Sequence, residues 1–131
     1  MTLPSDMLKI HETTKPDGEL APIFLVLEDG VLAITSDEGT FALPEGALDA
    51  VMTRFGGPLE PSEQLMPVAT LDLGSGKALR HVRHLARYDV IARDYIVYET
   101  PDREPVCALA TTLAGALGHL GRAANRGDQL G

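Results

Sequence analysis

The order of hydrophobic and polar positions in the first half of the chain predicts a β-hairpin. Apolar runs at 23–27 and 31–35 flank Asp29 and Gly30. Asp-Gly between two apolar runs is a strong signal for a tight turn, because glycine accepts the positive φ that such a turn requires. Both runs are apolar at successive positions, which indicates strands whose two faces are both covered.

A helix is predicted to follow this hairpin. A second turn leads into a short strand at 40–43, and residues 44–56 then form the helix, with Pro44 at its start. Apolar residues recur there at the spacing of one helix face: Leu48, Val51, Met52 and Phe55. The segment 56–63 is rich in glycine and proline and is interpreted as an internal connector.

The second half repeats the order of strands before a helix. Strands are predicted at 68–73, 94–99 and 106–110, and a helix at 111–124. The segment 77–87 is left open between helix and strand, because Leu79, Val82, Leu85 and Ala86 fit one helix face as well.

These elements predict an α+β protein with a single, largely antiparallel sheet of five or six strands. Two helices pack on it, or three if 77–87 is helical. We expect one domain over residues 1–131, with flexible ends at 1–8 and 125–131.

Composition is that of an ordinary soluble protein, with 44% hydrophobic and 23% charged residues. No apolar run approaches the ~20 residues that cross a bilayer, and the first residues lack a signal-peptide pattern. We therefore expect a cytoplasmic protein without a membrane partner. The single cysteine, Cys107, has apolar neighbours and is expected to be a small buried side chain.

Charge is unevenly distributed between the two halves. Residues 1–66 hold twelve acids and three bases, a net charge of -9, whereas residues 67–131 hold seven acids and eight bases, a net charge of +1. The bases gather in one stretch that contains no acid: Lys77, Arg80, Arg83 and Arg87. An acidic protein repels phosphate backbones, so nucleic acid is not expected as a partner. The stretch is expected to pair with the acidic half of the same chain or of another copy. The alternative is an anion site.

The stretch TLDLGSGKAL resembles the first motif of S-adenosylmethionine methyltransferases, with Asp72, Gly74 and Gly76 in place. Ala78 stands where the last glycine is needed, and too few residues follow for the further strand-helix units of such a fold. A phosphate-binding loop ending at Gly76 would need glycine in place of Leu71 and a hydroxyl in place of Ala78. We therefore expect a plain loop and no cofactor.

Motifs for metal binding and catalysis are incomplete. His81 and His84 would share a helix face but lie on opposite faces of a strand, and no nearby acid or cysteine completes a ligand set. No metal is therefore expected. Since no catalytic motif is complete either, the sequence favours a non-enzymatic protein.

The predicted last helix carries a stripe with almost no side chains, formed by Ala114, Gly118 and Gly121, with Gly115 further round. Each interior glycine costs about 1 kcal/mol relative to alanine, so a close approach of another backbone is expected to offset the cost. That backbone belongs either to the sheet beneath or to a second copy. We therefore expect a binding or assembly module that acts through protein–protein contacts as a homodimer. The alternative is a small-ligand protein or enzyme that binds an anion through residues 77–87.

Overall fold

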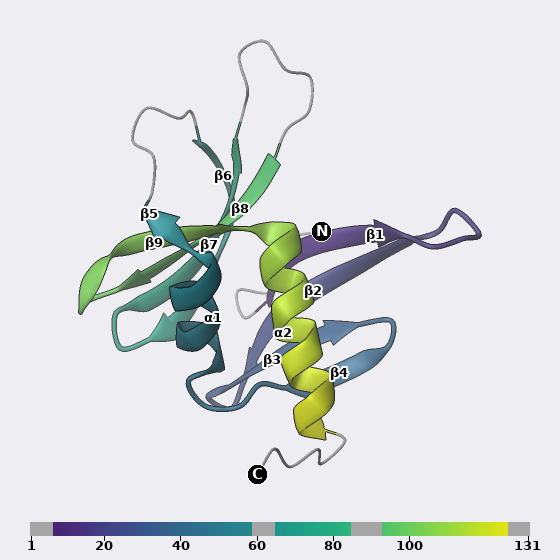
Figure 1. Cartoon of the computed structure of the whole chain (residues 1–131), viewed down its shortest axis with the longest axis horizontal. Coiled ribbons are helices and arrows are strands. Elements are labelled where there is room, and N and C mark those ends of the chain that lie inside the picture. The colour runs from purple at the N-terminus through teal and green to yellow at the C-terminus, as the bar shows by residue number, and fades with distance from the viewer. Residues whose placement is uncertain (1–6, 59–64, 85–92, 126–131) are drawn as a thin grey trace.

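The computed structural model describes residues 7–58, 65–84 and 93–125, which form two antiparallel sheets and two helices (Figure 1). The first sheet is a meander of four strands in chain order: β1 (Met7–Thr14), β2 (Leu20–Glu28), β3 (Val31–Ser36) and β4 (Gly39–Ala42).

The second sheet has five strands in the order β5-β9-β8-β7-β6. Their bounds are β5 (Gly57–Pro58), β6 (Leu65–Gly74), β7 (Lys77–His84), β8 (Arg93–Thr100) and β9 (Arg103–Leu109). Helix α1 (Ala47–Phe55) connects the two sheets, and α2 (Ala110–Asn125) continues directly from β9.

The predicted α+β class and both predicted helices are confirmed, but the single sheet is wrong. After β4 the chain enters α1, which carries it away from the first sheet to β5, and β5 pairs with β9 at the far edge of the second sheet. Each half therefore completes its own meander. Hydrophobic patterns identify strands but do not indicate which strands pair. The division of the strands into two sheets could therefore not be predicted from local sequence.

Two tight turns follow from residues that accept positive φ. Asp29 and Gly30 join β2 to β3 with φ values of 51° and 78°, as the Asp-Gly signal predicts. Gly74, Ser75 and Gly76 all have positive φ and join β6 to β7 as an antiparallel hairpin. The glycine turn of TLDLGSGKAL thus leads from strand to strand, whereas nucleotide-binding turns lead from a strand into a helix.

Two further sequence interpretations differ from the structure. Residues 77–84 form strand β7, so the helical alternative is wrong for this part, and residues 85–87 lie outside the described residues. Residues 7 and 8, expected in a flexible end, begin β1, and Leu8 is fully buried.

The core lies where the inner faces of both sheets meet the two helices. Helix α2 crosses the inner face of the first sheet and contacts β1, β3 and β4, while α1 packs on α2 and β9 (Figure 1). Strand β1 also contacts β6, β7 and β8, so the two sheets meet at this strand. The largest fully buried side chains come from both sheets and both helices: Leu8, Ile10, Leu25, Met52, Leu71, Leu79, Ile96, Leu113 and Leu117. In the described part of the chain, neither helix has the length and apolar character needed to span a membrane.

Candidate functional site

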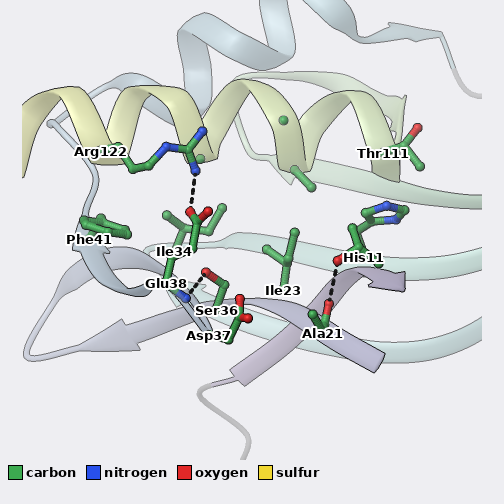
Figure 2. A pocket seen from close by; sticks show the side chains of 14 residues that line it. His11, Ala21, Ile23, Ile34, Ser36, Asp37, Glu38, Phe41, Thr111 and Arg122 are labelled. Atoms are coloured by element: carbon green, nitrogen blue, oxygen red, sulfur yellow. Dashed lines mark hydrogen bonds and ion pairs between the residues drawn. The ribbon is translucent and has the colours of Figure 1, made fainter. Parts of the chain in front are cut away.

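A cavity of about 310 Å³ lies between α2 and the inner face of the first sheet (Figure 2). We call it the helix cavity. The apolar part of its wall comes from both sides, with Ala21, Ile23, Ile34 and Phe41 on the sheet and Ala114 on the helix. Its volume is at the small end of the range of about 300–1,000 Å³ that is typical of ligand pockets.

Hydroxyl groups add hydrogen-bonding capacity to this wall. Thr13 Oγ1 donates to the Ala21 carbonyl at 3.3 Å, and Ser36 Oγ accepts from the Glu38 backbone N–H at 3.2 Å. Thr111 lies in the first turn of α2, on the helix side of the cavity (Figure 2). A hydroxyl both donates and accepts, so these groups can exchange a protein contact for one to a ligand.

Two ion pairs involve the acids of the β3–β4 turn at the same cavity. Arg122 Nη1 on α2 lies 3.2 Å from Glu38 Oε2 and thereby bridges the helix to the turn (Figure 2). Lys15 Nζ lies 2.9 Å from Asp37 Oδ2. These side chains are 35–61% exposed, so each pair contributes little to stability and can open at low cost. Charge is therefore balanced at this edge of the cavity.

The glycines of α2 serve different purposes. A Cβ added at Gly115 would meet no atom within 4 Å, so no packing contact requires a glycine there. At Gly118 the nearest atom is Arg122 Nη1, at 3.2 Å, so this glycine leaves room for the guanidinium that reaches back to Glu38. Both glycines line the helix cavity, Gly118 as a buried residue and Gly115 as an exposed one.

Gly121 instead allows close packing on the sheet. A Cβ there would lie 3.0 Å from both Ile34 Cγ2 and Phe41 Cβ, and 3.5 Å from the Phe41 carbonyl oxygen. Ala114 is also buried, and both residues face the first sheet of their own chain. At Gly121 the close approach expected from the sequence is therefore made by the sheet beneath.

The structure separates the residues of the predicted basic stretch. Arg80 and Arg83 lie on opposite faces of β7, and Arg87 lies outside the described residues. Arg80 Nε is 3.0 Å from Glu99, and Arg83 Nε is 2.9 Å from Asp94. Both partners belong to the second half of the chain, so within one chain these two arginines do not pair with the acidic first half as expected. Lys77 begins β7 beside the hairpin turn.

His81 and His84 do not form a joint site, because β7 places them on opposite faces. Among the described residues, no group of three or more histidine, cysteine, aspartate or glutamate side chains could hold a metal ion. Cys107 is half-buried rather than buried, because it lies at the β9–β5 pairing, where its Sγ donates to the Pro58 carbonyl at 3.7 Å.

Most residues of the helix cavity were not singled out from the sequence. His11, Ser36 and Arg122 come from β1, β3 and α2, and only the fold brings them together. The one local signal was the low-propensity glycine pattern of α2. No protein family, characterised protein sequence or solved structure matches the chain at a significant level.

Proposed function

We propose that this protein is a binding module that holds a small organic molecule in the helix cavity. The observation that carries the proposal is Gly115, an exposed residue of α2 that lines the cavity although no neighbouring atom requires a glycine there. An interior glycine costs about 1 kcal/mol of helix stability relative to alanine. Space for a ligand beside α2 would explain why a residue without a side chain is found there despite this cost.

The lining indicates the chemical class of the ligand. Apolar side chains such as Ile23 and Phe41 suit an apolar body, and the hydroxyls of Ser36 and Thr111 suit a few hydrogen-bonding groups. The charged groups are already paired with each other, Arg122 with Glu38 and Lys15 with Asp37. A small uncharged molecule with hydroxyl or amide groups therefore fits better than an anion.

Thermal-shift screening tests the proposal. The wild-type protein is screened against small uncharged metabolites and fragments with hydroxyl or amide groups. A ligand at one hundred times its dissociation constant stabilises the fold by about 2.7 kcal/mol, which raises Tm by several degrees. The hits are then titrated against two variants of α2.

Gly115→Leu places a side chain at the cavity wall, and Thr112→Leu is the matched control at an exposed position of the same helix that does not line the cavity. We expect Gly115→Leu to weaken binding of the hits by about tenfold or more, and Thr112→Leu to leave it unchanged. Hits that bind both variants as tightly as the wild type would refute the helix cavity as the site.

A second candidate function is self-association through β6, which would make the protein a homodimer. Strand β6 is the last strand of its sheet, and Met66 and Val68 on it are 43% and 48% exposed. Its outer edge has backbone groups without a neighbouring strand among the described residues, and such an edge can pair with a second copy.

Light scattering coupled to size exclusion tests this candidate. A dimer that Met66→Lys converts to monomer would support it. Leu20→Lys is the control, because Leu20 is an even more exposed apolar residue, at 61%, in the other sheet. A wild type that elutes with the mass of one chain at all concentrations would exclude the dimer.

A further inference from the structure

His81 is a buried polar side chain with no hydrogen bond. It is 5% exposed, and neither ring nitrogen has a hydrogen-bond partner among the described residues. Its Nε2 lies 3.4 Å from Asp94 Oδ2, close enough for attraction but outside hydrogen-bond geometry. Buried side-chain nitrogens are nearly always paired with protein, water or ligand. Asp94 faces Nε2, so Nδ1 is the buried nitrogen of His81 that has no partner among the described residues.

A second cavity, of about 260 Å³, lies beside this imidazole, between β1 and the strands β6, β7 and β8. We call it the His81 cavity. Two β-bulges border it, one between Lys9 and His11 in β1 and the other between Pro67 and Ala69 in β6. A bulge bends its strand and redirects side chains, and bulges are frequent beside functional sites. Val68, at the second bulge, is the most exposed residue of the lining.

The lining of the His81 cavity carries two basic and two acidic side chains. Lys9 Nζ lies 2.7 Å from Glu12, and Arg83 contacts the two oxygens of Asp94 through Nε at 2.9 Å and Nη2 at 3.5 Å. Arg83 Nη1 has no partner among the described residues, and Lys9 retains two further N–H donors. The cavity thus offers donors and acceptors at once.

The contact between Asp94 and His81 Nε2 determines the hydrogen-bonding role of His81 Nδ1. Because Asp94 lies close to Nε2, it favours the tautomer with the proton on Nε2, which leaves Nδ1 as a buried acceptor. An acceptor of this kind calls for a ligand N–H or O–H. Arg83 Nη1 and the remaining N–H groups of Lys9 can donate to a ligand oxyanion while both ion pairs stay in place.

We propose that the His81 cavity is a second binding site, specific for a small zwitterion of the α-amino acid type. The ammonium donates to His81 Nδ1 in a lining that also holds Asp94 and Glu12, while the carboxylate accepts from Arg83 and Lys9. Each half of the ligand meets the opposite charge, so an anion or a cation alone binds more weakly. This site is separate from the helix cavity, although His11 lines both.

NMR spectroscopy of the histidine side chains tests this proposal directly. Glycine and L-alanine are titrated into the 131-residue chain, and the ¹⁵N shifts of the His81 imidazole are followed. Acetate and methylammonium are the probes with one charge only. We expect saturable shifts with the amino acids, and binding at least about tenfold weaker for either single-charge probe.

Arg83→Gln and Arg80→Gln are the matched variants. Both remove a partly exposed arginine and its ion pair from β7, but Arg80 lies on the opposite face and does not line the cavity. We expect Arg83→Gln to weaken amino-acid binding by about tenfold and Arg80→Gln to leave it unchanged. The proposal is overturned by the absence of saturable shifts up to about 50 mM ligand, by equal binding of acetate alone, or by equal effects of the two variants.

Discussion

Replacing Gly121 by alanine is expected to destabilise the protein, whereas the same change at Gly115 is expected to stabilise it. Both residues are interior positions of α2, so each replacement gains about 1 kcal/mol of helix propensity. At Gly115 the new methyl group meets no atom within 4 Å, and the gain is retained. The expected result is an increase of about 1 kcal/mol in the free energy of unfolding.

At Gly121 the methyl group would lie 3.0 Å from Ile34 Cγ2 and 3.0 Å from Phe41 Cβ. Ile34 is buried, and Phe41 Cβ is attached to the backbone of β4, so neither atom can move without shifting packed structure. Overpacking of this kind costs about 1–3 kcal/mol. With about 2 kcal/mol for the clash and about 1 kcal/mol for the propensity gain, Gly121→Ala loses about 1 kcal/mol.

Urea unfolding followed by circular dichroism measures both variants against the wild type. The free energies of unfolding of the two variants should differ from each other by about 2 kcal/mol, because one lies about 1 kcal/mol above the wild type and the other about 1 kcal/mol below it. In heating experiments each change of 1 kcal/mol shifts Tm by about 4 °C at this chain length. If Gly121→Ala were as stable as Gly115→Ala, the assignment of different roles to these glycines would be refuted.

Three further predictions concern single side chains. Burial lowers the pKa of His81 from 6.5, against the opposing effect of Asp94, so the unfolded state binds more protons once the pH falls below that value. The free energy of unfolding should therefore fall as the pH drops below 6.5, and urea titrations of His81→Leu should lack this part of the decrease. Burial, aided by a 3.0 Å hydrogen bond to Asp49, raises the pKa of Tyr98 from 10.0 to about 12. The stabilising effect of the neutral Tyr98 hydroxyl is therefore complete below pH 10 and is lost as the pH rises towards 12. In the same assay, Tyr98→Phe should remove this alkaline dependence and cost about 1 kcal/mol at neutral pH. Arg122→Gln breaks an exposed ion pair with Glu38 and should change the free energy of unfolding from urea titrations by less than about 1 kcal/mol, while ligands of the helix cavity bind with altered affinity in the thermal-shift assay.

Local signals predicted the elements whose formation depends on neighbouring residues. Asp29 and Gly30 defined the β2–β3 turn, and the leucine spacing that includes Leu113 and Leu117 defined α2. The assignment of β7 was harder, because the buried side of that strand carries His81 next to Leu79. A polar residue at a core position interrupts the alternation that identifies a strand, so the helical spacing of Leu79 and Val82 fitted equally well.

The site was less predictable because it depends on tertiary contacts. The glycine pattern of α2 marked an unusual helix, but only the structure distinguishes Gly121, which packs on the sheet, from Gly115, which borders open space. The basic stretch was read as one patch, and β7 divides it between two faces. Asp94 on β8 contacts His81 on β7, and this contact between strands cannot be predicted from the spacing of the two residues in the sequence.

The central claim, that the helix cavity binds a small molecule, is tested most directly by a ¹H–¹⁵N NMR titration with the best hit of the thermal-shift screen. Glycine amides have distinctive ¹⁵N shifts, so Gly115 and Gly118 on the cavity wall can be compared with Gly18 and Gly30, which lie outside it in turns. We predict saturable shifts at Gly115 and Gly118 with little change at Gly18 and Gly30. Saturable shifts confined to other parts of the protein, with Gly115 and Gly118 unmoved, would contradict the claim.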